Sequence, residues 1–592
     1  MSAFTASDDA VTTAELPPAP TARLLDDVDV SVLASGVPVP WDLCPLGDGL
    51  RMLTVPARTG PVEIRLSVPL GDAAGYWHPQ AGWRRTLLAD WDGRAQTSLV
   101  DGYAAGALYD QTGATMLTFA VADPVPEISL RFGVSEERNS YVVHLWLPPS
   151  RDPSHVAFVE RSPSVASAMR ALRGWLASSH KTMEVPEPAR EPVYSTWYAF
   201  NQNVDAASVE TQAALAARIG CGVLILDDGW QKYGQGRGYA GCGDWTPDTL
   251  KFPDFTAHVA RVQAVGLRYM AWIAPLLLGP HAECYQEWER HASAPATVPG
   301  ARVLDPRHPE VRRRVVEVCV GLVRDHGLDG LKIDFLDEAM AYAGDGHGDV
   351  GLAMIRLLGE LREALEGVRP DVLIELRQPY VGPGMAPFGN MLRSFDCPGD
   401  ATANRVRTLD TSFLSVGGAV HSDPLMWDPR SPVETPARHL IGALHSVPQI
   451  SVRLDTLPED HLESLTFWLR LWRRLRPQVL DGVIEPGRPD GLYTLVEATA
   501  EGTGVLTVHG ERTVPVKTAT HDELVLVNGG TTDSLVLEVQ EGGVETESQL
   551  TIRDPTGHII DHSRMDLAPG LHRLPVPSTG LATLRFREGT TQ

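Results

Sequence analysis

Two acidic residues follow short apolar runs in the middle of the chain. Asp334 ends the run Gly330-Leu331-Lys332-Ile333, and Asp396 ends the run that begins at Met391. Such runs are typical of short buried strands, so each carboxylate is expected at the carboxyl-terminal tip of a strand. In a (β/α)8 barrel this edge carries the active site. Two carboxylates at neighbouring tips predict a retaining glycosidase, in which Asp334 attacks the sugar and Asp396 handles the proton.

Lys332 precedes the expected nucleophile by two residues. On a strand, residues i and i+2 point to the same side, so the ammonium group is expected beside the Asp334 carboxylate. A neighbouring cation keeps a carboxylate ionised, as a nucleophile requires. The alternative interpretation is a salt-bridged pair that closes the floor of the barrel.

A third strand tip carries Asp227 and Asp228, followed by Gly229 and Trp230. Carboxylates accept hydrogen bonds from sugar hydroxyls, and an indole ring covers the apolar face of a sugar ring. These residues therefore predict a sugar-binding site. The Asp-Gly pair is also a plain turn signal. Trp245 could line the same mouth, or it could belong to the core.

The same acids could instead hold Mg²⁺, since carboxylate oxygens are its usual ligands. However, no histidine joins Asp227, Asp228, Asp334 and Asp396 at ligand spacing, and Lys332 would repel a cation. The sequence therefore predicts neither a metal nor a cofactor.

Asp400 competes with Asp396 for the role of the general acid/base. Asp396 directly ends the apolar run, whereas Asp400 follows Pro398-Gly399 and precedes a helical segment. Because aspartate at that position typically caps the amino terminus of a helix, we expect a structural role for Asp400.

Composition narrows the class of protein. The chain has 592 residues, 43% of them hydrophobic, and a formal net charge of −24. An acidic chain disfavours nucleic acids and anionic membranes as partners and suits a neutral small-molecule sugar. The first nine residues contain neither a basic nor an apolar signal region, which favours a cytoplasmic enzyme. The six cysteines lack metal-ligand spacing, so they are expected to be free thiols in a reducing compartment.

Pattern changes along the chain predict three folded parts after a loose tail at 1–22. A β-sandwich with a linking helix is expected at 23–182, with strict alternation at 62–68 and a helix at 164–179. Residues 184–192 are proline-rich and predict a stiff linker. Strands alternating with amphipathic helices at 193–485 predict a (β/α)8 barrel, and short strands at 490–592 predict a second antiparallel sandwich. The eight barrel strands are expected to begin near Val193, Val223, Tyr269, Gly330, Val372, Asn390, Gly417 and Ile450.

At these residues the chain resembles the α-galactosidases of glycoside hydrolase family 36, the melibiases. The motifs that carry the resemblance are Leu226-Asp227-Asp228-Gly229-Trp230, Gly243-Asp244-Trp245, Lys251-Phe252-Pro253, Ala271-Trp272-Ile273-Ala274-Pro275, Val303-Leu304-Asp305 and Lys332-Ile333-Asp334. The resemblance implies an amino-terminal β-supersandwich, a (β/α)8 barrel and a carboxyl-terminal antiparallel β-sandwich, together with a possible homo-oligomer.

The resemblance also implies residue roles. Asp334 matches the family's nucleophile, and Asp396 matches an acid/base that precedes a second aspartate. Residues expected to bind the sugar by this comparison are Asp227 and Asp228 at the O4 and O6 hydroxyls, Lys332, and the aromatic positions Trp230 and Trp272. Arg393, which opens the Arg393-Ser394-Phe395-Asp396 motif, is placed in the same substrate-binding set.

The chain departs from the family pattern at two places. Ala274 stands where many members carry a carboxylate, and Leu376-Arg377-Gln378-Pro379-Tyr380 stands where many carry a cysteine and a glycine run. Arg377 and Gln378 are therefore expected to border the C2 side of the sugar.

The function these residues predict is a retaining α-galactosidase. Alternatives are an α-galactosyl transglycosylase of raffinose-synthase type, a retaining glycosidase for α-N-acetylgalactosamine, an arabinopyranose or a larger natural glycoside, and a sugar-binding protein without activity.

Overall fold

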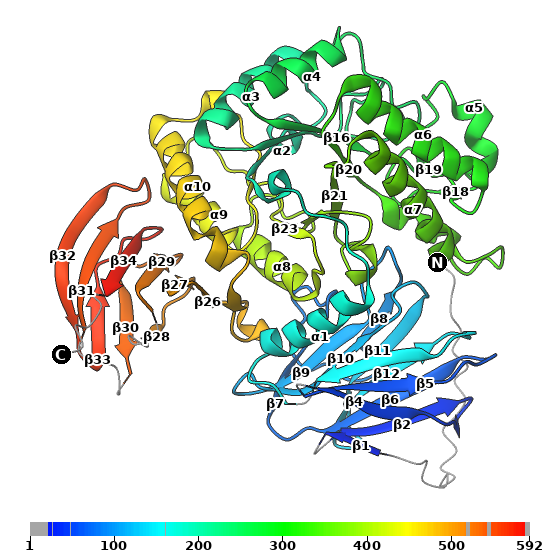
Figure 1. Cartoon of the computed structure of the whole chain (residues 1–592), viewed down its shortest axis with the longest axis horizontal. Coiled ribbons are helices and arrows are strands. Elements are labelled where there is room, and N and C mark those ends of the chain that lie inside the picture. The colour runs from blue at the N-terminus through cyan, green and yellow to red at the C-terminus, as the bar shows by residue number, and fades with distance from the viewer. Residues whose placement is uncertain are drawn as a thin grey trace.

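A central (β/α)8 barrel lies between two β-sandwiches in the computed structural model (Figure 1). The structure describes residues 22–25, 28–47, 49–159, 161–516, 521–540 and 546–586. The amino-terminal sandwich, drawn in blue, lies below the barrel, and the carboxyl-terminal strands, in orange and red, lie to its left. The predicted fold class is confirmed, while the tail expected at 1–22 lies outside the described residues except for Ala22.

Two antiparallel sheets form the amino-terminal sandwich, in the orders β1-β2-β6-β12-β11-β8, with β3 beside β2, and β4-β5-β13-β10-β9-β7. Their strands are β1 (Ala22–Leu25), β2 (Val28–Ala34), β3 (Val37–Pro38), β4 (Asp42–Gly47), β5 (Leu50–Val55), β6 (Val62–Pro69), β7 (Ala73–Trp77), β8 (Arg94–Thr97), β9 (Ala105–Asp110), β10 (Thr115–Val121), β11 (Ile128–Ser135), β12 (Ser140–Leu147) and β13 (Ser154–Val159). Strand β6 alternates buried and half-buried side chains, as the pattern at 62–68 predicts.

Helix α1 (Val165–Ser179) joins the sandwich to the barrel. The hydroxyl of Ser164 accepts a hydrogen bond from the amide of Ser167 at 3.0 Å, which caps the first turn. The helix buries Val165, Met169 and Leu172, among others, in a core shared by the second sheet and the barrel. This is the apolar face that the helical spacing predicts.

The barrel sheet has the order β23-β22-β21-β20-β16-β15-β14-β24, and all neighbours run parallel. The strands are β14 (Val193–Ser195), β15 (Val223–Leu226), β16 (Arg268–Ile273), β20 (Gly330–Ile333), β21 (Leu373–Arg377), β22 (Met391–Arg393), β23 (Ala419–His421) and β24 (Gln449–Ile450). Each starts within two residues of its predicted start. Two isolated bridges, His421 with Val447 and Leu425 with Ile450 of β24, bring the chain at and after β23 back toward β24 and nearly close the ring.

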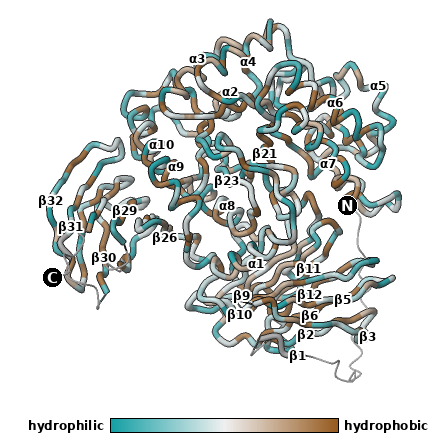
Figure 2. Tube along the Cα trace, viewed as in Figure 1, coloured by the Kyte–Doolittle hydropathy of each residue, from teal (hydrophilic) through white to brown (hydrophobic). Residues whose placement is uncertain are grey.

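Amphipathic helices surround the barrel. They are α2 (Trp197–Phe200), α3 (Ala206–Ile219), α4 (Phe255–Ala264), α5 (Tyr285–Trp288), α6 (Pro309–His326), α7 (Val350–Val368), α8 (Ala401–Leu414), α9 (Glu434–Gly442) and α10 (Glu459–Val479). Hydrophobic and hydrophilic residues alternate along the long helices α6 and α7 in Figure 2, because each of these two helices buries an apolar face. A small sheet of β17 (Leu277–Leu278), β18 (Ala294–Pro295) and β19 (Arg302–Val303) lies in the long connection after β16.

The carboxyl-terminal sandwich has one sheet in the order β25-β26-β27-β29-β34-β31-β32 and a second in the order β28-β30-β33. Their strands are β25 (Val483–Glu485), β26 (Leu495–Ala500), β27 (Thr503–Val508), β28 (Thr513–Val516), β29 (Glu523–Asn528), β30 (Leu535–Val539), β31 (Thr546–Arg553), β32 (Ile559–Leu567), β33 (Gly570–Leu574) and β34 (Leu581–Phe586). Two of the pairs are parallel, β27 with β29 and β28 with β30, so the sandwich is not wholly antiparallel.

The proline-rich segment at 184–192 is more than the spacer that its composition predicts. Its short 3-10 helix (Glu187–Arg190) buries Ala189 completely at the amino-terminal end of the barrel. The carbonyl of Ala189 lies 2.8 Å from Nε2 of His421 on β23. The segment therefore closes the bottom of the barrel by packing.

A buried ion pair connects the amino-terminal sandwich with the barrel. The guanidinium of Arg85 contacts the carboxylate of Asp410 on α8, which also accepts hydrogen bonds from Trp77 Nε1 at 2.9 Å and Tyr493 Oη at 2.6 Å. Because Tyr493 follows the barrel in the chain, one carboxylate links three parts of the molecule.

Among the described helices, none has both the length and the apolar composition of a membrane span.

Candidate active site

The interior of the barrel changes from apolar to charged along the strands. Its amino-terminal end is filled by Val193, Val223, Ile225, Met270, Leu373 and Met391. Residues two positions further along a strand point to the same side. At these positions the strands carry Asp227, Trp272, Glu375 and Arg393. The strands therefore deliver polar groups to the carboxyl-terminal rim, where barrels of this kind place their sites.

Asp334 lies at this rim directly after β20, and it is almost completely buried. Its Oδ1 accepts hydrogen bonds from Arg377 Nε at 2.5 Å, Tyr380 Oη at 3.1 Å and the amide of Phe335 at 2.8 Å. Its Oδ2 accepts one from Trp272 Nε1 at 2.9 Å. Oδ2 is therefore the less occupied of the two oxygens.

The charges around Asp334 keep it ionised. Burial alone would raise the pKa of this carboxyl, but Arg377, Lys332 and Arg393 outweigh burial and hold the pKa well below its usual range. An ionised carboxylate with one accessible oxygen can act as a nucleophile.

Lys332 helps to keep Asp334 ionised, as predicted, but its hydrogen bond goes to another carboxylate. Nζ of Lys332 donates its hydrogen bond to Oδ2 of Asp227, at 2.5 Å, and acts on Asp334 only through its charge. The direct partner of Asp334 is Arg377, which comes from the neighbouring strand β21. The side chain that was expected at the C2 side of a sugar thus holds the expected nucleophile.

The carboxylate of Asp228 is held by two amides. Its Oδ2 accepts from Gln202 Nε2 at 2.6 Å and its Oδ1 from Gln231 Nε2 at 2.7 Å. Burial raises the pKa of Asp228 to about 6, although both amides favour the ionised form. Gly229 makes the turn possible: its φ is +116°, and a Cβ atom there would lie 2.5 Å from the backbone of Gln202.

Trp230, which was predicted to bind the sugar, packs against a helix. Its ring is completely buried and stacks on Phe255 of α4 at 5.5 Å. Its Nε1 donates to the carbonyl of Trp272 at 2.9 Å. The indole therefore belongs to the core between sheet and helix. Trp272 is the aromatic residue of the pair that contacts the site, and Trp245 packs edge-on against it at 5.6 Å.

Arg393 is the centre of a second charged group. Its Nη1 donates to Oδ1 of Asp396 at 2.9 Å and to Oδ1 of Asp423 at 2.6 Å, and its Nε lies 3.6 Å from Oε1 of Glu375. Arg393, Asp423 and Glu375 are buried, whereas the side chain of Asp396 is 49% exposed. Asp396 is thus the member of this group that an incoming molecule can reach.

Asp400 has the structural role that its position predicts. It is the N-cap of α8, and its Oδ1 accepts a hydrogen bond from the amide of Ala403 at 2.8 Å. A capping carboxylate typically contributes about 1 kcal/mol to helix stability.

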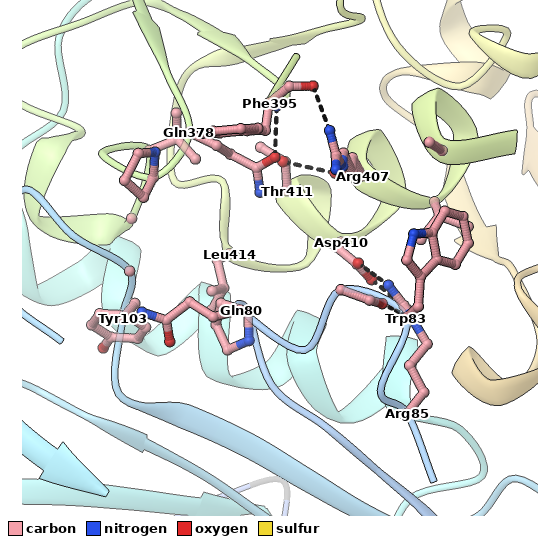
Figure 3. A pocket seen from close by; sticks show the side chains of 18 residues that line it. Gln80, Trp83, Arg85, Tyr103, Gln378, Phe395, Arg407, Asp410, Thr411 and Leu414 are labelled. Atoms are coloured by element: carbon pink, nitrogen blue, oxygen red, sulfur yellow. Dashed lines mark hydrogen bonds and ion pairs between the residues drawn. The ribbon is translucent and has the colours of Figure 1, made fainter. Parts of the chain in front are cut away.

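Gln378 lies apart from the sugar-binding set in which it was predicted. Its Oε1 accepts a hydrogen bond from the amide of Phe395 at 2.8 Å, and the side chain lines a cavity between the barrel and the amino-terminal sandwich (Figure 3). Neighbouring residues on an extended chain point to opposite sides, so Gln378 turns away where Arg377 turns toward Asp334.

Comparison with known proteins agrees with this geometry. Residues 180–374 match the family model described as Melibiase. The match covers the first half of the barrel, up to strand β21. α-Galactosidase C of Emericella nidulans is 29% identical over 161 residues, which are 24% of this chain and 22% of that protein. An α-galactosidase of Escherichia coli is 28% identical over 193 residues, 30% of this chain and 26% of that protein. The matched segment thus spans about a quarter of these relatives' length.

Solved structures match over far more of the chain. The GH36 α-galactosidase AgaA of Geobacillus stearothermophilus aligns with a TM-score of 0.61 and 14% identity over 95% of this chain and 81% of that chain. TtGalA, an α-galactosidase of Thermus thermophilus, aligns with a TM-score of 0.54 and 17% identity over 78% of this chain and 98% of that chain. The three-part fold is therefore the one that GH36 α-galactosidases have.

Two acids at the carboxyl-terminal rim were missed by the sequence analysis. Asp423 follows strand β23, so the rule that selected Asp334 and Asp396 would also have selected it. Glu375 lies within β21 and gives no comparable signal. We use the name acid cluster for Asp227, Asp228, Asp334, Glu375, Asp396 and Asp423.

One group of side chains outside the acid cluster has the spacing of metal ligands. Among the described residues, His291, His308 and Glu310 bring their ligand atoms within 4.8 Å of one another. Nε of Arg290 donates to Nε2 of His291 at 3.1 Å, so a cation already occupies the lone pair that a metal would need. The group therefore fits a metal poorly.

Asp423 titrates close to neutral pH. Burial raises the pKa of its carboxyl to about 7, against the opposing charge of Arg393. This pKa is higher in the folded than in the unfolded chain. The contribution of Asp423 to the free energy of unfolding is therefore fully present at acidic pH and is lost as the pH rises toward 7.

We therefore expect Asp423→Asn, which cannot ionise, to gain stability relative to the natural protein as the pH rises from about 4.5 to 7.5, by about 3 kcal/mol. Urea unfolding at several pH values measures the difference between the two proteins. Asp428→Asn is the control, because Asp428 is exposed and its lowered pKa keeps it ionised throughout this range. Parallel curves for Asp423→Asn and the natural protein would contradict the assignment.

Proposed function

We propose that this protein is a retaining α-galactosidase, with Asp334 as nucleophile and Asp396 as general acid/base. The observation that carries the proposal is the contrast between these carboxylates. Asp334 is buried and ionised between Arg377 and Trp272, whereas Asp396 is half exposed on a neighbouring part of the same rim. The likeness to α-galactosidases in sequence and fold supports galactose as the sugar of the substrate.

In the first half of the reaction, Oδ2 of Asp334 attacks the anomeric carbon while Asp396 gives its proton to the leaving oxygen. The covalent bond forms between Asp334 and the sugar, and the glycosidic bond breaks. Arg377 and Tyr380 stay on Oδ1, so they orient the carboxylate without covering the attacking oxygen. In the second half, Asp396 takes a proton from water while the water oxygen attacks the anomeric carbon. The bond between the sugar and Asp334 breaks, which returns the carboxylate and releases the sugar with its original configuration.

The two halves require opposite protonation states of Asp396. Burial would raise the pKa of its carboxyl, but Arg393 and Lys332 lower it in the free protein, which favours the basic form. A bound sugar that covers the half-exposed carboxyl removes water from it, and this desolvation raises the pKa and favours the acidic form. Arg393 contacts three carboxylates, those of Asp396, Asp423 and Glu375. Its effect on the pKa of Asp396 is therefore moderate.

Binding of the sugar falls to the other side of the rim. Asp227 with Lys332, and Asp228 with its two glutamines, present charged groups that exchange hydrogen bonds with hydroxyls. Charge-assisted bonds of this kind are the stronger class. We assign Asp227, Asp228 and Lys332 to the O4 and O6 hydroxyls of galactose.

Aryl α-galactosides test the activity and its stereochemistry together. We expect hydrolysis in which NMR spectra show α-galactose as the first product, because two successive displacements restore the configuration. A series of aryl α-glycosides that differ at C2 and C4 measures the sugar preference, and an added sugar acceptor reveals any transfer. Initial formation of β-galactose would exclude the proposed mechanism.

Substituting the nucleophile should remove turnover and permit chemical rescue. We expect Asp334→Gly to lower kcat/KM by at least about 10⁴-fold, because no side chain can form the intermediate. Added azide should occupy the vacated space and convert an activated aryl α-galactoside into β-galactosyl azide. Near-normal hydrolysis by Asp334→Gly without azide would eliminate Asp334 as the nucleophile.

The acid/base assignment is tested by leaving groups of different acidity. We expect Asp396→Ala to lower kcat/KM by about 10²-fold or more for poor leaving groups and far less for dinitrophenyl α-galactoside, which needs no proton. Asp400→Ala is the matched control, since loss of the α8 cap should reduce thermal stability and leave this dependence unchanged. If the dependence appeared in Asp400→Ala instead, the two assignments would be exchanged.

A further inference from the structure

A cavity of about 250 Å³ lies between the amino-terminal sandwich and helix α8 (Figure 3). The sandwich contributes Gln80, Trp83 and Tyr103 to its wall, and the barrel contributes Gln378, Phe395 and Leu414, among others. Segments more than 300 residues apart in the chain therefore form one space.

The cavity is a direct neighbour of the expected acid/base. Phe395 and Gln378 line it, while the adjoining residues Asp396 and Arg377 belong to the charged groups on the other side. The guanidinium of Arg377 lies 5.5 Å from the centre of the Phe395 ring. The Phe395 ring therefore lines the cavity and also lies close to Arg377, the partner of Asp334. The leaving oxygen of a substrate must lie beside Asp396, so the group attached to that oxygen is directed toward this side.

Polar side chains in the wall already have partners. Nε2 of Gln80 donates to the carbonyl of Gln96 at 3.2 Å, Oε1 of Gln378 accepts from the Phe395 amide, and Oγ1 of Thr411 donates to the carbonyl of Arg407 at 2.8 Å. A sugar that entered would lose hydrogen bonds to water and find these particular atoms already paired.

Two more polar side chains of the wall are also occupied. The carboxylate of Asp410 is held by Arg85, Trp77 and Tyr493, and Arg407 donates to the carbonyl of Phe395 at 3.2 Å. Two aromatic side chains of the wall are well exposed: Trp83 is 54% exposed and Phe395 43% exposed. Flat apolar rings bind such a surface by stacking and by release of water.

We propose that this cavity binds the leaving group of the substrate and that this group is an aromatic, apolar ring system instead of a second sugar. The inference rests on the proposed function, because it places the leaving group by means of Asp396. Trp83, in the amino-terminal sandwich, would then determine specificity for the leaving group, whereas residues of the barrel bind the sugar.

Phenyl and 2-naphthyl α-galactosides test the inference, because the two phenols have nearly the same acidity and differ in apolar area. We expect the natural protein to have a KM about fivefold lower for the naphthyl compound, with a similar kcat. Trp83→Ala should abolish this preference, and Trp83→Phe should restore part of it. Trp91→Ala is the matched control, since Trp91 is 67% exposed in the same sandwich and lies outside the cavity.

Binding of free 2-naphthol, followed by equilibrium dialysis, separates this inference from the proposed function. We expect saturable binding to the natural protein, to Asp334→Gly and to Trp91→Ala, and at least about fivefold weaker binding to Trp83→Ala. If the natural protein hydrolysed no galactoside but bound 2-naphthol as expected, the proposed function would be overturned. The preference of the cavity for aromatic rings would then still stand. Equal binding to Trp83→Ala and Trp91→Ala, or a KM ratio that Trp83→Ala does not change, would overturn the inference.

Discussion

Three buried cations hold the acid cluster together, and the rest of the site depends on this balance of charge. Lys332 pairs with Asp227, Arg377 with Asp334, and Arg393 with Asp423 and Asp396. Removing one partner from a buried pair leaves the other charge uncompensated, which typically costs about 3–5 kcal/mol. Each cation also acts on more than its own partner, since all three lower the pKa of Asp334. The charges therefore constrain one another in position as well as in protonation.

Parallel pairing of the strands makes this balance possible. Asp227, Asp334 and Asp423 lie far apart in the sequence, but each follows a strand of the same sheet, and parallel strands end at the same rim. The apolar layer below the rim excludes water from the floor, which strengthens the charged contacts above it. The amino-terminal sandwich and the segment that follows the barrel are joined to this frame through Asp410 on α8.

Carboxyl groups of one chemical type acquire different properties in this setting. Cations keep Asp334 ionised, burial brings the pKa of Asp228 to about 6 and that of Asp423 to about 7, and Asp396 stays half exposed. Chemistry that needs one ionised carboxylate and one that exchanges a proton requires such a separation. The separation arises from the number of cations and the amount of water near each group, and residue type alone does not supply it.

Local patterns in the sequence determined much of this protein. The starts of the eight barrel strands, the apolar face of α1 and the capping role of Asp400 were predictable, because periodicity and capping depend on residues close together in the chain. The rule that places acids at strand tips identified Asp334 and Asp396, and it would have identified Asp423 had it been applied to β23.

Only the tertiary structure decided which side chains meet. Trp230 turns into the core, Gln378 turns into the cavity, and Arg377, on a neighbouring strand, replaces Lys332 as the direct partner of Asp334. These outcomes depend on how a side chain leaves a turn or a strand end and on what packs against it from distant parts of the chain. Sequence spacing determines that a residue reaches the rim, whereas packing and charge from other strands determine the direction in which it points and the proton that it holds.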